Sequence, residues 1–215
     1  MIQPSTVLLV DDHPLLRKGL QQLLSLVEDM EVIGEATNGA DAIRLGIELD
    51  PDLILLDLNM QGMDGLETLS RLRDQGVTSR IVMLTVSDAD ADVLEAIRRG
   101  ADGYLLKDME PEQLLEQLQR ALQGKLVMSE AVTQVLASAI RKPKQNPHAS
   151  LESLTSRERD IIELIAKGLS NKLIARDLDI SDGTVKVHVK HLLKKLGLRS
   201  RVEAAVWMVN QKSTE

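Results

Sequence analysis

The 215-residue sequence has no cysteine and no phenylalanine, and only one tyrosine and one tryptophan. Without cysteine, disulfides, thiolate metal sites and a cysteine nucleophile are excluded. The sequence also lacks a run of about 18 apolar residues, so no transmembrane helix is expected. Its first residues lack the basic segment and cleavage site of a signal peptide. We therefore expect a cytoplasmic protein with no membrane contact.

Charge is distributed unevenly along the chain. Residues 1–130 contain 11 Lys+Arg and 24 Asp+Glu, a balance of −13, whereas residues 131–215 contain 15 and 9, a balance of +6. A basic C-terminal part on an acidic chain favours two separate roles, one of them binding a polyanion. An unevenly charged solvated surface explains the same numbers, so this split alone does not decide.

Short apolar runs alternate with amphipathic segments in the first half of the chain. The runs are 6–10, 31–35, 52–57, 80–85 and 103–107. A first helix is expected from the leucine spacing between Leu16 and Val27, and others near Asn38, Asp64, Asp88 and Pro111. Strands that are apolar on both faces and alternate with helices predict a flavodoxin-like α/β domain, a doubly wound sheet of five parallel strands.

The C-terminal part is predicted to be all helical. Thr155 and Glu158 form a capping-box pattern, and Ser170, Ser181 and Ser200 each precede a helical segment. Before them, "RKPKQNPHAS" at 141–150 has two prolines and no aliphatic cluster, which is typical of an exposed linker. The expected domains are 1–128, a linker with one helix at 129–150, and a helix-turn-helix domain at 151–215.

Three carboxylates are expected to meet at one edge of the predicted sheet. Asp57 ends the buried run "LILL", and Asp11 and Asp12 follow the first strand. The carboxyl ends of the first and third strands are neighbours in a flavodoxin-like sheet. Because such close acids repel one another, a divalent cation is the natural compensator, and oxygen ligands without His or Cys favour Mg²⁺.

Two more strand ends complete this candidate site. Thr85 ends the fourth strand with a hydroxyl, and Lys107 ends the fifth with an ammonium. With a metal, these groups suit phosphoryl transfer to Asp57, since the metal and Lys107 would neutralise the transferred group and Thr85 would hydrogen-bond it. Taken singly, each of these residues is explained as a turn, a cap or a neutralising charge.

The segment "SDGTVKVHVKHLLKKLG" predicts a basic recognition helix. Its apolar face carries Val185, Val189, Leu192, Leu193 and Leu196. The other faces carry the candidate DNA contacts Lys186, Val187, His188, Lys190 and Lys194. Lysines early in such a helix reach base edges in the major groove, an exposed valine meets a thymine methyl, and later cations meet phosphates. A solvated basic face is the alternative.

The motifs "DDHP", "LILLDLNM", "MLT" and "GADGYLLKD", over about residues 5–125, resemble the receiver domain of bacterial two-component response regulators. This resemblance implies that Asp57 is the phosphoacceptor and that Mg²⁺ is held by Asp11, Asp12, Asp57 and the backbone carbonyl of Asn59. It also implies that Lys107 contacts the phosphate and that Thr85 and Tyr104 form the switch pair, although Tyr104 is explained equally as a core residue. Gln61 and Asp108 stand where the family usually has proline.

Residues 151–212 resemble a LuxR-type helix-turn-helix, with "LTSRERDIIELIAKGLSNKLIARDLDISDGTVKVHVKHLLKKL" as the signature. Both parts together resemble the NarL subfamily, close to the nitrate/nitrite response regulators. This implies a sensor histidine kinase as phosphodonor, promoter DNA as target, and Lys186, Val187 and Lys190 as base-reading residues. RNA polymerase is a further candidate partner. In related proteins the unphosphorylated receiver masks the recognition helix, and phosphorylation frees the C-terminal domain to dimerise on DNA. The expected dimer face is on the final helix, although ordinary core packing explains the same residues, Val202, Ala205, Val206 and Val209.

Two other classes of function compete with a transcription regulator. A haloacid-dehalogenase-like phosphatase also uses a strand-end aspartate with Mg²⁺, but it needs a second aspartate at position 59, where Asn59 stands. A receiver that acts only through protein partners would not bind duplex DNA, which separates it from the preferred interpretation. We therefore expect a DNA-binding regulator and not an enzyme.

Overall fold

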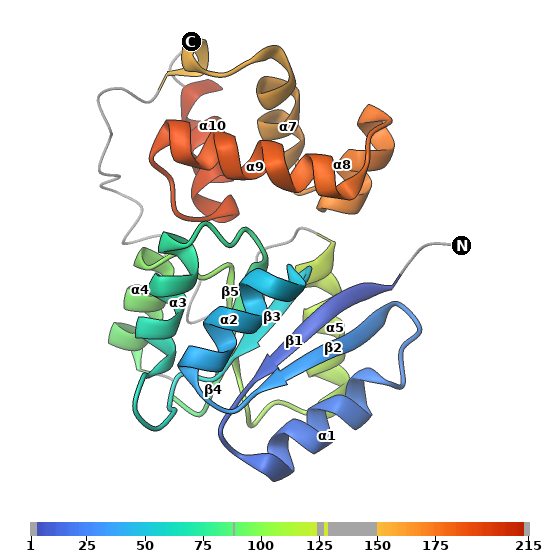
Figure 1. The fold of residues 1–215 in the computed structure, drawn as a ribbon, viewed down its shortest axis with the longest axis vertical. Coiled ribbons are helices and arrows are strands. Elements are labelled where there is room, and N and C mark those ends of the chain that lie inside the picture. The colour runs from blue at the N-terminus through green and yellow to red at the C-terminus, as the bar shows by residue number, and fades with distance from the viewer. Residues whose placement is uncertain (1–3, 88, 124–126, 129–149, 213–215) are drawn as a thin grey trace.

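The computed structural model describes residues 4–87, 89–123, 127–128 and 150–212. They form an α/β domain followed by a helical domain (Figure 1). The predicted linker with its helix, 129–150, lies outside these ranges except for Ser150. Within the described ranges, no helix combines the length and apolar character needed to cross a membrane.

A six-stranded parallel sheet forms the centre of the α/β domain. Its strands are β1 (Ser5–Val10), β2 (Met30–Ala36), β3 (Leu53–Leu56), β4 (Arg80–Thr85), β5 (Gly103–Leu106) and β6 (Val127–Met128). Their order is β2-β1-β3-β4-β5-β6. The flavodoxin-like prediction is confirmed, with β1 and β3 as neighbours. The sheet gains β6, which was not predicted because two residues are too few to show a periodic pattern.

Helices cover both faces of the sheet. One face packs against α1 (Pro14–Leu24) and α5 (Pro111–Leu122), and the other against α2 (Gly39–Leu49), α3 (Gly65–Asp74) and α4 (Asp90–Arg98). Successive residues of a strand point to opposite faces, so Val7 and Leu9 enter one core and Leu8 and Val10 enter the other. Both cores are apolar, which explains why β3 and the interiors of β1 and β4 are continuous apolar runs, whereas the edge strand β2 carries exposed glutamates.

The helical domain has a core of its own. It contains the short 3₁₀ helix η1 (Leu151–Ser153) and the helices α7 (Ser156–Ala166), α8 (Asn171–Leu178), α9 (Asp182–Leu196) and α10 (Arg201–Lys212). The predicted capping box is present, because Thr155 and Glu158 each accept the other's backbone N–H. Ser170, Ser181 and Ser200 cap the next three helices as predicted. These caps fix where each short helix begins.

The helical domain packs against the amino ends of the receiver strands. Its residues touch Pro4 and Asp52, which precede β1 and β3, and the loop that contains Gly76 before β4. Asp57 follows the carboxyl end of β3, at the opposite edge of the sheet. In Figure 1 the strand arrowheads accordingly point away from the helical domain. The two candidate functional regions therefore lie at opposite ends of the sheet.

Candidate functional site

The structure brings Asp11, Asp57 and Lys107 together at the carboxyl ends of three strands. Val10 pairs with Leu56 across β1 and β3, so the aspartates that follow them are neighbours. The Nζ atom of Lys107 lies 2.7 Å from Asp11 Oδ2 and 2.9 Å from Asp57 Oδ1. Both aspartates are 2% exposed, so this lysine compensates two buried carboxylates at once.

The acidic pocket has more negative charge than Lys107 can compensate. Ligand atoms of Asp11, Asp12, His13 and Asp57 lie within 4.8 Å of one another. Burial raises the pKa of Asp57, and repulsion from Asp11 adds to this, while Lys107 partly offsets both. Among the described residues, Asp57 Oδ2 is buried and has no hydrogen-bond partner. An unpartnered carboxylate oxygen beside two further acids fits a hard divalent cation.

Two neighbours of this pocket were missed by reasoning from the sequence. His13 donates its backbone N–H to Asp11 Oδ1 at 2.7 Å, and its Nδ1 lies 2.9 Å from Asp12 Oδ1. The backbone N–H of Gln61 donates to Asp12 Oδ2 at 3.1 Å. Proline, usual at position 61 in the family, has no N–H to give. Glutamine in place of proline at position 61 therefore adds a hydrogen bond to the pocket. The contact of His13 with the acids had a signal in the sequence, because His13 directly follows the two aspartates.

The predicted switch residues Thr85 and Tyr104 are linked through one residue of the loop after β4. Thr85 Oγ1 accepts the backbone N–H of Ser87 at 3.1 Å. Tyr104 Oη donates to the Ser87 carbonyl at 2.9 Å. Both side chains are buried, and the tyrosine ring belongs to a hydrophobic core. Movement of Thr85 toward the pocket would break its bond to Ser87 and so affect the partner of Tyr104.

The predicted metal ligand Asn59 lies next to the pocket. Its backbone N–H donates to Asp57 Oδ1 at 3.3 Å.

Helix α9 directs its predicted base-reading residues toward the α/β domain. Its five predicted core residues are all buried. Lys186, Val187 and Lys190 line a groove of about 310 Å³ whose other wall is formed by α2 and the loop after α3. His188 is half-buried and Lys194 is exposed, and neither lines this groove. The face that would enter a DNA groove is therefore turned toward another domain.

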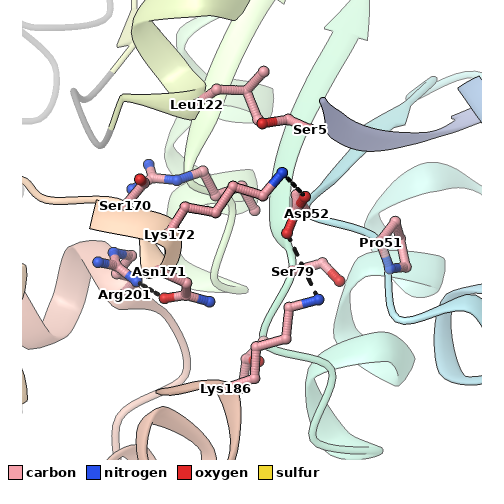
Figure 2. Close-up of a pocket in the computed structure, with 12 residues that line it drawn as sticks. Ser5, Pro51, Asp52, Ser79, Leu122, Ser170, Asn171, Lys172, Lys186 and Arg201 are labelled. Carbon is pink, nitrogen blue, oxygen red and sulfur yellow. Dashed lines mark hydrogen bonds and ion pairs between the residues drawn. The ribbon is translucent and has the colours of Figure 1, made fainter. Parts of the chain in front are cut away.

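A group of four charged residues, which we call the clasp, holds the two domains together: Asp50, Asp52, Lys172 and Lys186. Lys172 Nζ lies 3.1 Å from Asp52 Oδ2, and Lys186 Nζ lies 3.2 Å from Asp50 Oδ2 and 3.6 Å from Asp52 Oδ1. Figure 2 shows Asp52 between the two lysines. Burial alone would raise the pKa of Asp52, but the Thr6 N–H and both lysines outweigh it and lower this pKa.

Gly76 lies where the loop before β4 meets the Lys190 side chain of the helical domain. Gly76 has a φ of +75°, a conformation that L side chains rarely adopt. A Cβ atom there would lie 2.7 Å from Lys190 Cε. Any other residue would therefore be strained itself and would push the Lys190 side chain away from the receiver.

Helix α10 carries the predicted dimer face. Ala204 and Met208 are buried in the core of the helical domain. The four predicted dimer residues, Val202, Ala205, Val206 and Val209, are half-buried or exposed, with Val209 at 53%. The helix therefore packs in the core along one side and leaves apolar surface along the other.

Comparisons with known proteins agree with both halves of this arrangement. The family model of the response regulator receiver domain matches residues 7–119, and that of bacterial regulatory proteins of the luxR family matches residues 152–208. The nitrate/nitrite response regulator protein NarL of Escherichia coli strain K12 is 58% identical over 96% of this chain and 95% of its own. NarP of the same strain is 50% identical over 99% and 98%.

A solved structure covers nearly the whole length of the chain. It is the response regulator ChrA of a heme-sensing two-component system, with a TM-score of 0.52, 33% identity, and coverage of 98% of this chain and 99% of that one. The strand-end acids, the capped recognition helix and these matches lead to one conclusion. The chain belongs to the response regulators that join a receiver domain to a LuxR-type DNA-binding domain.

Proposed function

We propose that a sensor histidine kinase phosphorylates this chain on Asp57, and that the phosphorylated protein binds promoter DNA as a dimer. The observation that carries this proposal is the Lys107 ammonium held between Asp11 and Asp57. In the transfer, an Asp57 oxygen attacks the phosphorus of a phosphohistidine and forms a P–O bond. The P–N bond breaks, and its electron pair stays on the histidine nitrogen, which takes up a proton.

The residues around Asp57 divide the work of this transfer. Lys107, already 2.9 Å from Asp57, would offset the charge of the arriving phosphoryl oxygens. Thr85 would donate its hydroxyl hydrogen to one of them. Asp11, Asp12, Asp57 and the Asn59 carbonyl would hold Mg²⁺. When bound, this ion supplies electrostatic stabilisation of the developing negative charge.

Docking of α9 on the receiver would keep the unphosphorylated protein from its target. Lys186 cannot pair with Asp50 and Asp52 and at the same time reach a base edge. Phosphorylation is proposed to weaken the docked form and to free Lys186, Val187 and Lys190 for base contacts, with His188 and Lys194 near phosphates. The released helical domain would then dimerise through α10. This is a population shift between two arrangements of rigid domains.

The relatives also suggest the signal and the domain limits. NarL and NarP are named for nitrate and nitrite, so we propose that this chain regulates nitrate- or nitrite-responsive genes in the bacterial cytoplasm. We propose domain limits of 1–128 for the receiver, 129–150 for the linker and 151–215 for the DNA-binding domain. Its role would be regulation of transcription and not turnover of a substrate.

Labelling with a small radioactive phosphodonor and Mg²⁺ tests the phosphorylation site. Asp57→Ala should abolish stable labelling, because the variant lacks the carboxylate that accepts the phosphoryl group. Glu31→Gln is the control, since it removes an exposed acid of β2 that belongs neither to the pocket nor to the clasp and should label like wild type. Undiminished labelling of Asp57→Ala would refute the proposed site.

A further inference from the structure

A small cavity lies between the two domains, beside the clasp. Its volume is about 30 Å³, roughly twice the ~10–15 Å³ that one water molecule needs. Receiver residues from the amino ends of the strands form one wall, and residues of α8, α9 and α10 form the other. Figure 2 shows Lys172, Lys186 and Arg201 on the helical-domain side and Asp52 and Ser79 on the receiver side. The cavity therefore exists only while the domains are docked.

The charged lining of this cavity is mainly positive. It consists of Arg80, Lys172, Lys186 and Arg201 with the single carboxylate of Asp52. Both lysines already face that carboxylate in the clasp. Arg201 gives its donors to uncharged oxygens, Asn171 Oδ1 at 2.5 Å and the Leu169 carbonyl. The two guanidiniums therefore contribute positive charge that the lining carboxylate does not balance.

These two guanidiniums are nearly removed from solvent. Arg80 is 8% exposed and Arg201 is 7% exposed. Burial lowers the pKa of Arg201 to about 9, and repulsion from Arg80 contributes to the shift. Attraction from Asp102 raises both pKa values, and attraction from Asp182 also raises that of Arg201, but Asp102 Oδ2 is engaged by Arg73 at 2.5 Å and by the Ile81 N–H. A further anion close to the arginines would offset more of the cost of burying them.

The receiver wall also presents two unused donors. Arg80 Nη2 and Ser79 Oγ are both buried, and neither has a hydrogen-bond partner among the described residues. They belong to adjacent residues and both residues line the cavity. A guanidinium N–H and a hydroxyl together match the oxygens of an oxyanion. A water molecule also accepts such hydrogens, but it adds no negative charge to offset the burial of the two guanidiniums.

We propose that this interdomain cavity binds one small inorganic oxyanion, of the size of nitrate or inorganic phosphate. Arg80 and Ser79 donate to it from the receiver, and Arg201 faces it from α10. Because the site needs both walls, the bound anion stabilises the docked arrangement and, by linkage, lowers the affinity for DNA.

Calorimetric titration of the full-length unphosphorylated protein tests the site. Sodium nitrate and sodium phosphate are titrated separately, with chloride adjusted to keep ionic strength constant. At least one anion should bind at one site per chain with a Kd below about 10 mM. Arg80→Gln should weaken this binding at least tenfold and Ser79→Ala about threefold. Arg44→Gln, which removes an exposed arginine of α2 and the same charge, should leave the Kd unchanged.

Several results would overturn the proposal. No saturable binding of either anion would do so, and so would a Kd that is the same in wild type and Arg80→Gln, because the anion would then occupy another basic surface. If circular dichroism shows that Arg80→Gln is unfolded, Ser79→Ala decides, since it removes only a hydroxyl. An unchanged Kd in that variant would refute the site.

A second measurement tests the linkage to DNA and rests on the proposed function. At constant ionic strength, replacing chloride by the bound anion should weaken promoter binding severalfold in wild type and not in Arg80→Gln. Retained anion binding with no effect on DNA would support the site and contradict masking by the docked receiver. If the wild-type protein shows neither anion binding nor an effect of the anion on promoter binding, the site itself is contradicted.

Discussion

Asp57 and Asp52 lie at opposite ends of β3, and their charges are compensated in different ways. The pKa of Asp57 is raised by burial among other acids, whereas the pKa of Asp52 is lowered because a backbone N–H and two lysines outweigh burial. At the carboxyl end, one oxygen of Asp57 is left without a partner. At the amino end, the two charged partners of Asp52 come from another domain. The same residue type thus forms a reactive pocket at one end and an interdomain contact at the other.

Removing the receiver eliminates both the Asp57 pocket and the Asp52 contact, and it should have the largest effect on DNA affinity. A fragment of residues 150–215 retains the complete core of the helical domain. It should bind promoter DNA at least tenfold more tightly than the unphosphorylated full chain, because nothing covers α9. Fluorescence anisotropy with promoter duplexes measures this. A fragment no tighter than the full chain would contradict masking.

Lys190→Ala should lower specific DNA affinity by ~1–3 kcal/mol if Lys190 reads a base. Lys190 approaches the receiver at Gly76 and is not part of the clasp. Its loss should therefore weaken binding in the phosphorylated protein and in the fragment alike. The measurement is a promoter titration against a scrambled duplex, with exposed Lys167→Ala as control. An unchanged affinity would remove Lys190 from the base-reading set.

Asp52→Asn weakens the clasp at the amino end and leaves the phosphorylation pocket intact. The amide keeps the oxygen that accepts the Thr6 N–H but loses the charge that attracts Lys172 and Lys186. The DNA affinity of the unphosphorylated protein should rise by ~1–2 kcal/mol, which is about fivefold to thirtyfold. Anisotropy measures the change, with exposed Glu31→Gln as the charge-matched control. No gain over that control would show that the clasp does not limit DNA binding.

The pH dependence of docking is expected to show the smallest effect, but it distinguishes the contributions of Asp52 and Asp182. The Thr6 N–H lowers the pKa of Asp52, and the two lysines that docking brings to Asp52 lower it further, so Asp52 stabilises the docked form above its ordinary value of 3.8, and this stabilisation is lost as the pH falls through the lowered value. Burial and the nearby Asp52 raise the pKa of Asp182, so its ionisation opposes docking, and this cost disappears as the pH falls through the raised value. The two groups therefore act with opposite sign.

Single substitutions separate these two contributions. As the pH falls below about 3.8, Asp182→Asn should lose docking, since Asp52 remains. Asp52→Asn should instead gain docking as the pH falls toward 3.8 through the raised pKa of Asp182, because burial, the largest cause of that shift, remains. Small-angle X-ray scattering of the folded proteins measures the separation of the domains. The same direction of change in both variants would contradict this assignment.

The pocket around Asp57 was largely predictable from the sequence. Parallel strands place their carboxyl ends at one edge, so residues that end three apolar runs, Asp11, Asp57 and Lys107, had to meet. The Gln61 N–H was not predictable, because a backbone donor has no sequence signature. His13 was overlooked although it directly follows the two aspartates.

The clasp could not be predicted in the same way. Asp52 and Lys172 belong to different domains, and no hydrophobic period specifies how two separately folded bodies meet. Recognition of the family suggested that α9 would be covered, but not which carboxylates would cover it. Arg80 and Ser79 also gave no signal, because an arginine at the start of a strand usually lies in solvent.

Strand β3 is only four residues long, Leu53–Leu56, and all four are buried. Asp52 immediately precedes it and Asp57 immediately follows it. A one-residue insertion or deletion would turn the strand's side chains over and pull one aspartate out of place. The length of this strand must therefore suit two sites at once. A change of length that moved Asp52 in the domain contact would also displace Asp57 in the pocket at the other edge of the sheet.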